Sequence, residues 1–266
     1  MEIFIFGSNG MLGNYIRSFL SQKYQVTGFT RDDYDLSKLK IESLSNLLPL
    51  KENDIVINCA GVIPQAAKDR DIDRRLCFQV NSIFPVILSM ICKQKNAKFI
   101  HITTDCVFSG KDGNYNENSI HDETSDYGIS KSLGELCCGT IIRTSIIGEE
   151  IYNKRSLLEW VRANTNQQIN GYTNHHWNGV TCLQLAKIIN QMIEKDIFWD
   201  GVKHIFSNKV TKYELISMIN QIYELKITIT QFETEKVDKT ITSIGETLFV
   251  IPDLFTQIQE MKNYIL

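Results

Sequence analysis

Apolar residues in the first half of the chain fall into short, nearly continuous runs. Three of these runs are EIFIF at 2–6, DIVINCAG at 54–61 and AKFIHITT at 97–104. Strands that are buried on both faces of a sheet have this pattern. Two further strands are expected at 24–29 and 140–147.

Between these strands, apolar positions recur at helical spacing. Helices are therefore expected at 10–22, 36–48, 74–95 and 125–138. Pro85 is a candidate for a kink in the third helix. A regular alternation of strands and helices is typical of a parallel sheet with helices on both faces. The pattern predicts an α/β fold with a doubly wound parallel sheet.

The second half of the chain has a different pattern. Helices are expected at 155–164, 181–195, 211–223 and 253–264, and strands at 203–206 and 226–232. These elements predict a smaller C-terminal α/β lobe laid against the first domain. We place the domains at 1–148 and 149–266, with a soft boundary, because such lobes often share strands with the main sheet.

Three glycines follow the first strand in the stretch GSNGMLG: Gly7, Gly10 and Gly13. In a strand–loop–helix unit, glycines permit a sharp turn, let the backbone approach a pyrophosphate and let the helix pack closely. The N-terminus of the helix then offers unpaired N–H groups and a partial positive charge to the phosphates. The loop therefore predicts a dinucleotide-binding domain of the Rossmann type.

The end of the second strand, GFTRDDYD, should meet the adenosine ribose of such a cofactor. An NAD site usually has an acidic residue here that accepts a hydrogen bond from the ribose 2′-OH. In this chain Thr30 and Arg31 come first, and a guanidinium matches a 2′-phosphate. Arg31 favours NADP, with NAD as the alternative, and Asp35 and Leu36 are expected near the adenine.

A second candidate group is the pair Tyr127 and Lys131 in YGISK. Four residues apart on a helix, the two side chains share one face. An ammonium close to a phenol lowers its pKa, and the pair can then donate and accept a proton for a carbonyl/alcohol couple. The fourth strand ends at Thr103 and Thr104, at the edge where parallel α/β sheets bind ligands. A threonine hydroxyl there can hydrogen-bond a substrate oxygen.

Composition narrows the choice of partners. A chain of 266 residues with a formal net charge of −3 has no overall basic field for nucleic acid or an anionic membrane. We expect no apolar run long enough to cross a bilayer. Seven cysteines without CxxC spacing indicate a reduced, cytoplasmic protein with no structural metal.

Taken together, the motifs resemble the extended short-chain dehydrogenases/reductases. Within that superfamily the chain is most similar to the dTDP-4-dehydrorhamnose reductase family of sugar-nucleotide-modifying enzymes. The matching stretches run in order from residue 1 to about 190 and are GSNGMLG, DIVINCAG, VNS at 80–82, HITTDCVFSG, YGISK, IIRTS and NGVT at 178–181.

The resemblance implies a role for each matching residue. Thr104, Tyr127 and Lys131 would form the catalytic triad: Tyr127 would protonate a keto oxygen, and Lys131 would hold the nicotinamide ribose. The rest of the cofactor would contact Gly7, Asn9, Gly10, Met11, Leu12, Gly13, Asn58, Cys59, Ala60, Gly61 and Asn81. Substrate contacts are expected at Val62, Gln65, Thr104, Asp105, Cys106, Val107, Phe108 and Trp177.

Cys106 departs from the family, which commonly carries an aromatic residue after the aspartate. In the related GDP-fucose synthase type, a cysteine two positions past the catalytic Ser/Thr acts in C3/C5 epimerisation. Cationic surroundings can tune a thiol for this task. Cys106 is therefore also a candidate catalytic residue, with Lys154 or Arg155 near the position of a partner acid.

A second departure is the stretch NHHWNGVT at 174–181. Trp177 could stack on the nucleotide base or the sugar, or it could be an ordinary contact between lobes. His175 and His176 have no third metal ligand at a sensible spacing, so we expect no metal.

The leading interpretation is NAD(P)H-dependent reduction of the 4-keto group of a dTDP- or UDP-linked 6-deoxyhexulose in deoxysugar biosynthesis. One alternative is a bifunctional 3(,5)-epimerase/4-reductase that uses Cys106. Another is a non-catalytic NADP-binding subunit like the regulatory subunit of methionine adenosyltransferase, which resembles the same family. The amphipathic C-terminal segment 247–266 leaves a homodimer open.

Overall fold

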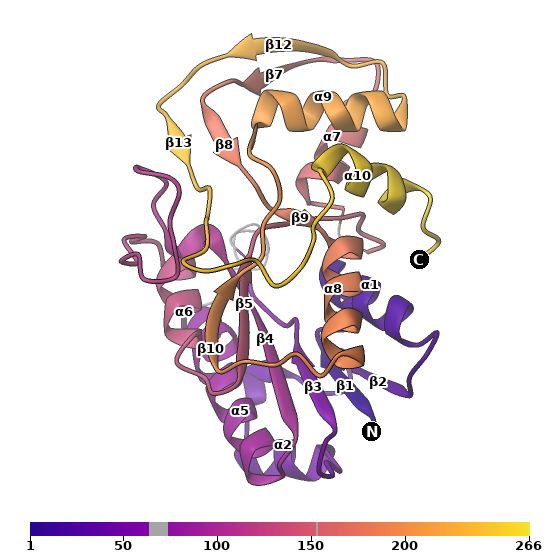
Figure 1. The fold of residues 1–266 in the computed structure, drawn as a ribbon, viewed down its shortest axis with the longest axis vertical. Coiled ribbons are helices and arrows are strands. Elements are labelled where there is room, and N and C mark those ends of the chain that lie inside the picture. Colours follow the sequence, from indigo (N-terminus) through magenta and orange to yellow (C-terminus); the bar gives the residue numbers. More distant parts are fainter. Residues whose placement is uncertain (64–73, 153) are drawn as a thin grey trace.

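A computed structural model describes residues 1–63, 74–152 and 154–266 (Figure 1). In this described part, the main sheet has six parallel strands in the order β10-β5-β4-β3-β1-β2. The strands are β1 (Ile3–Phe6), β2 (Val26–Phe29), β3 (Ile55–Asn58), β4 (Lys98–Thr104), β5 (Thr140–Thr144) and β10 (Gly201–His204). Their order reverses between β1 and β3, which marks the ligand-binding edge of such sheets. The predicted Rossmann-type α/β fold is confirmed.

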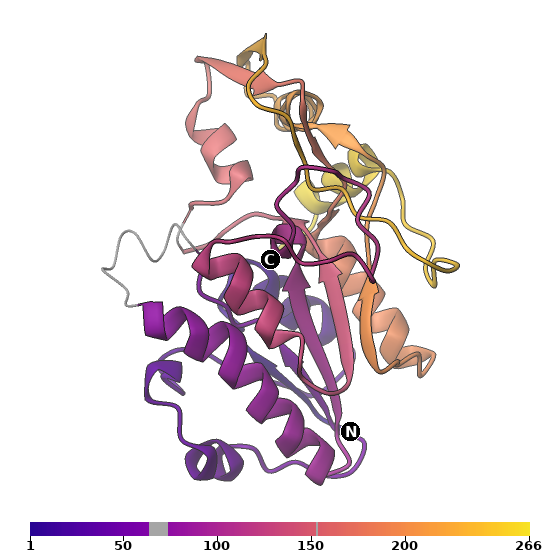
Figure 2. The same ribbon diagram turned by 90° about the vertical axis from the view of Figure 1, so that its left-hand side faces the viewer.

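Helices cover both faces of this sheet (Figure 2). They are α1 (Met11–Leu20), α2 (Ile41–Leu47), α4 (Arg74–Phe78), α5 (Phe84–Gln94), α6 (Asp126–Gly134) and α8 (Cys182–Glu194), with short segments η1 (Leu36–Lys38), η2 (Gln79–Ile83) and η3 (Asp105–Val107). Ile3 and Ile5 point into the core shared with α1 and α8, whereas Phe4 and Phe6 point into the core shared with α2 and α5. Because alternate side chains enter two different cores, β1 is apolar at every position.

Residues 74–94 form one helical run made of α4, the π-helical segment η2 and α5. The irregularity expected at Pro85 lies just before it, in η2. Contrary to expectation, this run is long and apolar enough, by length and composition, to span a membrane, although 56% of its most apolar window is buried. Phe84 and Leu88 pack on the sheet in the second core, so the apolar character of the run serves the interior of the protein.

A second lobe lies beyond the carboxyl ends of the main strands (Figure 1). Its elements are α7 (Leu157–Ala163), β7 (Gln168–Tyr172), β8 (His175–Trp177), β11 (Val210–Thr211), α9 (Lys212–Tyr223), β12 (Thr228–Phe232), β13 (Val237–Asp238) and α10 (Leu254–Lys262). The short strands β6 (Ile146–Ile147) and β9 (Val180–Thr181) pair with each other where the chain passes between the lobes.

One predicted element of this lobe lies elsewhere. The strand expected at 203–206 is β10, and it pairs with β5 in the main sheet. The preceding helix α8 packs against α1 in the first core. The segment 182–204 therefore returns to the first lobe, and the boundary near Gly148 stays a prediction that allows for such sharing.

Candidate active site

The glycine loop makes a tight passage between β1 and α1. Gly7 has a φ of +74°, a left-handed conformation that favours glycine. A Cβ on Gly13 would lie 2.2 Å from the Gly7 carbonyl oxygen, so only glycine lets the helix approach the loop this closely. Asn9 and Gly10 are exposed at the start of α1, and Met11 is partly exposed, whereas Leu12 packs into the core. This geometry fits a diphosphate at the N-terminus of α1.

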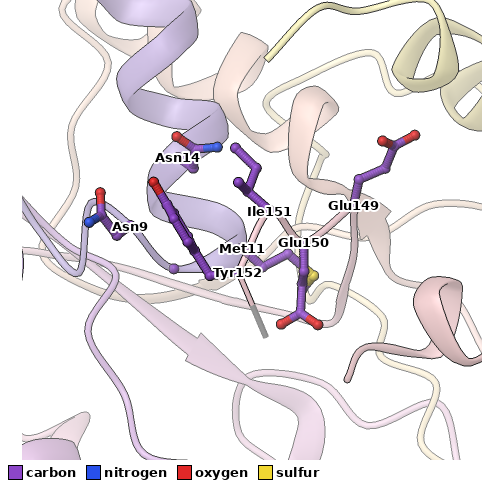
Figure 3. A pocket seen from close by; sticks show the side chains of 8 residues that line it. Asn9, Met11, Asn14, Glu149, Glu150, Ile151 and Tyr152 are labelled. Carbon is purple, nitrogen blue, oxygen red and sulfur yellow. The ribbon is translucent and has the colours of Figure 1, made fainter. Parts of the chain in front are cut away.

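A segment from the lobe junction borders this loop. Together with Asn9, Gly10, Met11 and Asn14, residues Glu149 to Tyr152 line a small pocket (Figure 3). The Tyr223 hydroxyl of α9 donates a hydrogen bond to Glu149 Oε1 at 2.6 Å, and the Glu149 N–H donates to the Tyr15 hydroxyl at 3.3 Å. Glu149 therefore connects the glycine-loop helix to the second lobe.

At the expected adenosine end, the acidic residues have local partners. Asp33 accepts hydrogen bonds from the Thr30 N–H and hydroxyl at 2.8 and 2.7 Å. Asp35 caps η1 by accepting from the Ser37 N–H at 2.9 Å. The Arg31 side chain is 55% exposed and its Nε lies 3.9 Å from Asp35. Arg31 is thus open to solvent at the carboxyl end of β2, as a 2′-phosphate contact requires.

Asn58, expected to line the middle of the cofactor, has a fully buried side chain. Its Oδ1 accepts from the Ala60 N–H at 3.1 Å, and its amide nitrogen lies 3.1 Å from His101 Nδ1. Burial raises the pKa of the neighbouring Cys59 thiol to about 12. Asn58 therefore shapes the turn after β3, and the backbone from Cys59 to Gly61 is the part that a cofactor can reach.

The predicted triad is brought together at the carboxyl end of β4. The Thr104 hydroxyl accepts from the Cys106 N–H and donates to Asp105 Oδ1, both at 3.1 Å, and Thr104 lies near enough to Tyr127 to act on the pKa of its phenol. The Lys131 Nζ donates to the Ile102 carbonyl at 3.1 Å. These contacts place a phenol, a hydroxyl and an ammonium at one edge of the sheet.

The pKa shifts differ from those expected from sequence. Burial, followed by the nearby Cys106, raises the pKa of Tyr127, and Thr104 acts in the opposite direction. Burial lowers the pKa of Lys131, while Glu135 acts to raise it. The lowering of the Tyr127 pKa that the Lys131 spacing suggested is therefore not the direction found, because desolvation of the phenol and the neighbouring Cys106 and Asp105 all raise the pKa.

Two packing features hold α6 against the site. A Cβ on Gly128 would lie 2.7 Å from the Cys106 carbonyl oxygen, so glycine at this position lets Tyr127 approach η3. Asn81 in η2 accepts from the Val62 N–H at 2.9 Å and donates to the Val62 carbonyl and the Ser130 hydroxyl, both at 3.0 Å. The side chain of Asn81 thus ties the loop after β3 to the helix that carries Lys131.

Asp105 and Cys106 occupy the turn after Thr104, and the Cys106 thiol lies 3.6 Å from Asp105 Oδ1. Burial raises the pKa of Asp105. Burial and the Asp105 carboxylate raise the pKa of the Cys106 thiol to about 12, while Lys239 acts to lower it. The surroundings therefore favour a neutral thiol rather than the thiolate that an epimerisation base requires.

The cations at this turn come from the second lobe. Lys239 and Lys212 both act electrostatically on Asp105 and Cys106. Lys154, considered from sequence as a partner acid, has an exposed side chain, as has Arg155. Sequence reasoning missed Lys212 and Lys239, because neither lies in a recognisable motif.

The other predicted substrate contacts differ in how far their side chains are buried. Val107 and Phe108 are fully buried in a small core with Tyr115, so their side chains are enclosed. Trp177 is 5% exposed and belongs to the main core, which favours its interpretation as a contact between lobes. Val62 is partly exposed, and Gln65 lies outside the described residues.

His175 lies at the edge of the second lobe with partners of its own. Its Nε2 is 2.7 Å from the Thr234 hydroxyl, and its ring stacks on Tyr172. No group of three or more His, Cys, Asp or Glu side chains suited to a metal ion is found among residues 1–63, 74–152 and 154–266.

A parallel sheet with a glycine loop at its first βα turn and a Thr–Tyr–Lys group beside it defines an extended short-chain dehydrogenase/reductase. The chain belongs to the family described as RmlD substrate binding domain, whose family model matches residues 1–240. The resemblance drawn from the motifs is thus confirmed at the level of family.

Relatives by sequence carry names from sugar metabolism. The chain is 32% identical over 145 residues to a probable low-salt glycan biosynthesis reductase of Haloferax volcanii, covering 51% of this chain and 48% of that protein. It is 31% identical over 137 residues to the dTDP-4-dehydrorhamnose reductase of Burkholderia thailandensis, covering 51% and 45%. The chain thus spans about half the length of the curated relatives that it matches.

Similarity in structure extends over the whole chain. A crystal structure of dTDP-4-dehydrorhamnose reductase from Bacillus anthracis in complex with NADP has a TM-score of 0.81 and 20% identity, covering 98% of each chain. A structure of a dTDP-4-dehydrorhamnose reductase from Clostridium acetobutylicum has a TM-score of 0.78 and 20% identity, covering 99% of each. At this identity the likeness establishes the fold.

Proposed function

We propose that this protein is an oxidoreductase that uses NADPH to reduce the 4-keto group of a nucleotide-linked 6-deoxyhexulose, as in the synthesis of rhamnose-like sugars. The observation that carries the proposal is the meeting of Thr104, Tyr127 and Lys131 at the sheet edge beside the glycine loop. The relatives named for dTDP-sugar reduction support the same class of substrate.

The residues present fit a dinucleotide. The close passage at Gly13 and the exposed Asn9 and Gly10 would hold its diphosphate, and the exposed Arg31 would meet a 2′-phosphate. Lys131 lies close to Gly61, since a Cβ built on Gly61 would be 3.9 Å from the Lys131 Nζ. This lysine would hold the hydroxyls of the nicotinamide ribose. When bound, the reduced nicotinamide supplies a hydride to the sugar carbon.

The protein's own groups then handle the proton. Tyr127 is protonated at neutral pH, as a phenol with its ordinary pKa of 10.0 already is, and burial raises that pKa further. It donates its proton to the keto oxygen as that oxygen gains negative charge. Thr104 orients the same oxygen through its hydroxyl. Desolvation of the site strengthens both contacts, since the effective dielectric constant is lower than in water.

The bifunctional alternative depends on Cys106 as a base. A thiol whose pKa is raised to about 12 is a poor base at neutral pH, so we propose reduction without epimerisation. Incubation with substrate and cofactor in deuterium oxide tests this. We expect no deuterium at sugar C3 or C5, and incorporation that Cys106→Ala abolishes would support the epimerase instead.

The regulatory alternative is tested by turnover. We expect the wild-type protein to oxidise NADPH with a dTDP- or UDP-linked 4-keto sugar, identified by mass spectrometry of the product. If neither the wild-type protein nor Tyr127→Phe turns over any sugar in the panel while both bind NADPH equally, the non-catalytic interpretation is supported.

Arg31 provides the test of cofactor choice. We expect Arg31→Ala to raise the KM for NADPH and to leave the KM for NADH nearly unchanged, because only NADPH carries the 2′-phosphate. We also propose action in the cytoplasm, where a protein whose described cysteines are all free stays reduced. A homodimer stays a prediction.

A further inference from the structure

The second lobe extends a lysine toward the end of β4. Lys212 is the first residue of α9, and strand β11 just before it pairs with β8, where Val210 lies opposite Trp177. The Lys212 ammonium lies 5.3 Å from the centre of the Trp177 ring. Asp105 and Cys106 are the charged or ionisable groups that act on it. The lysine thus faces the turn that follows Thr104.

Lys212 differs from its lysine neighbours in its partners. Lys209 pairs with Asp238 at 2.6 Å, and Lys239 pairs with Glu123 at 3.3 Å. Within the described part of the chain, Lys212 has no ion pair and no hydrogen bond through its ammonium. Its contact there is the face of an aromatic ring.

The surroundings of Lys212 disfavour a cation. The N-terminus of a helix carries a partial positive charge and gives a lysine no stabilisation. Burial lowers the pKa of Lys212, with Asp105 and Cys106 acting in the opposite direction. A partly buried ammonium in this setting gains stability when a bound molecule supplies oxygen acceptors.

We propose that Lys212 is a substrate-binding residue that donates a hydrogen bond to an oxygen of the substrate's sugar ring and so helps to determine which sugar is accepted. The inference rests on the proposed function. Asp105 and Cys106 directly follow Thr104, whose hydroxyl serves the keto oxygen. A group that faces both residues lies at the sugar rather than at the diphosphate, and the second lobe thereby completes a site built on the first.

Steady-state kinetics with NADPH and a dTDP-linked 4-keto-6-deoxy sugar test the assignment. We expect Lys212→Met to raise the KM for the sugar nucleotide by about tenfold or more, with a smaller change in kcat, since a hydrogen bond from a charged donor is lost. Lys212→Arg should restore part of the affinity. The inhibition constant of dTDP alone should stay unchanged.

The matched control is Lys203→Met. Lys203 lies on β10 with its ammonium 5.6 Å from the centre of the Trp199 ring, so this variant also removes a lysine from the face of a tryptophan. We expect its KM and kcat to equal those of the wild type. Thermal melting of every variant separates the loss of a substrate contact from the loss of the fold. If Lys212→Met does not fold, Lys212→Arg and its inhibition constant for dTDP provide the test instead.

Two outcomes would overturn the assignment. An unchanged KM in a folded Lys212 variant would remove the contact altogether. An inhibition constant for dTDP that rises by the same factor as the KM would place the lysine at the diphosphate. Failure of the wild-type protein to oxidise NADPH with any 4-keto sugar nucleotide would instead refute the proposed function.

Discussion

Tyr127 is a phenol whose surroundings keep its proton in place. Burial, with Cys106 and Asp105 nearby, raises its pKa, and Thr104 opposes that rise only in part. Lys131 is turned toward the Ile102 carbonyl. At the scale of the residue, Tyr127 therefore keeps its proton until an oxygen beside it becomes more basic than the phenolate, as the keto oxygen does when hydride transfer turns it into an alkoxide.

Removal of the Tyr127 hydroxyl should abolish most of the reductase activity. We expect Tyr127→Phe to lower kcat by about 10²- to 10⁴-fold, the usual contribution of a positioned acid, while the Kd for NADPH stays near that of the wild type. Tyr172→Phe, in β7 of the second lobe, is the control and should leave kcat unchanged. A kcat for Tyr127→Phe close to that of the wild type would exclude Tyr127 as the proton donor.

At the scale of elements, α6 must approach η3 closely for Tyr127 to reach Thr104. Ser125 caps the helix by accepting from the Gly128 N–H at 3.2 Å. The absence of a side chain at Gly128 lets the helix lie against the Cys106 backbone. The close approach of α6 to η3 therefore helps to set the geometry of the reacting groups, together with the side chains that hold the helix in place.

Addition of one methyl group at this contact should be costly. We expect Gly128→Ala to reduce the free energy of unfolding by about 1–3 kcal/mol and to lower kcat, because the carbonyl oxygen of Cys106 cannot move aside easily. Gly245→Ala is the matched control, since a Cβ there meets nothing within 4 Å. Urea titration and steady-state kinetics measure both effects, and equal behaviour of the two variants would contradict the packing argument.

At the scale of the whole molecule, one buried ionic network joins segments distant in sequence. Arg143 of β5 is 2% exposed and donates to Glu135, to His204 Nε2 at 2.8 Å and to His121 Nε2 at 2.7 Å. His204 in turn lies on β10 and contacts the Thr242 carbonyl at 2.6 Å. The network links α6, which carries the proposed proton donor, to the strand contributed by the C-terminal half.

Loss of one partner in this network should destabilise the fold strongly. We expect Glu135→Gln to lower the free energy of unfolding by about 3–5 kcal/mol, because the buried Arg143 loses its carboxylate. The control is Glu260→Gln, whose side chain is 42% exposed and pairs with Lys187 at 2.8 Å; its cost should be about 0–1 kcal/mol. Urea denaturation measures the free energy of unfolding of both variants. A small effect of Glu135→Gln would show that the buried network contributes little to stability.

The burial of histidine side chains makes the stability of the whole molecule depend on pH. Burial lowers the pKa of His101 and of His204 from an ordinary value of 6.5, so the unfolded chain binds more protons below about that pH. Stability is therefore full above pH 6.5 and falls as the pH decreases, by up to about 1.4 kcal/mol per pH unit for each histidine. Urea titrations between pH 5 and 7 measure this slope. We expect a shallower slope in His204→Gln, and identical slopes would contradict the linkage.

The sequence alone determined the elements and the motifs of this protein. Apolar runs, helical spacing, the glycine loop and YGISK report local backbone preference and the burial of whole strands, so they can be recognised without knowledge of the fold. The tertiary structure alone decided that β10 joins the main sheet, that Val107 and Phe108 are enclosed, and that Lys212 and Lys239 reach the turn after β4. It also decided the direction of the Tyr127 pKa shift. These features depend on desolvation and on contacts between residues far apart in the chain, which no local pattern records.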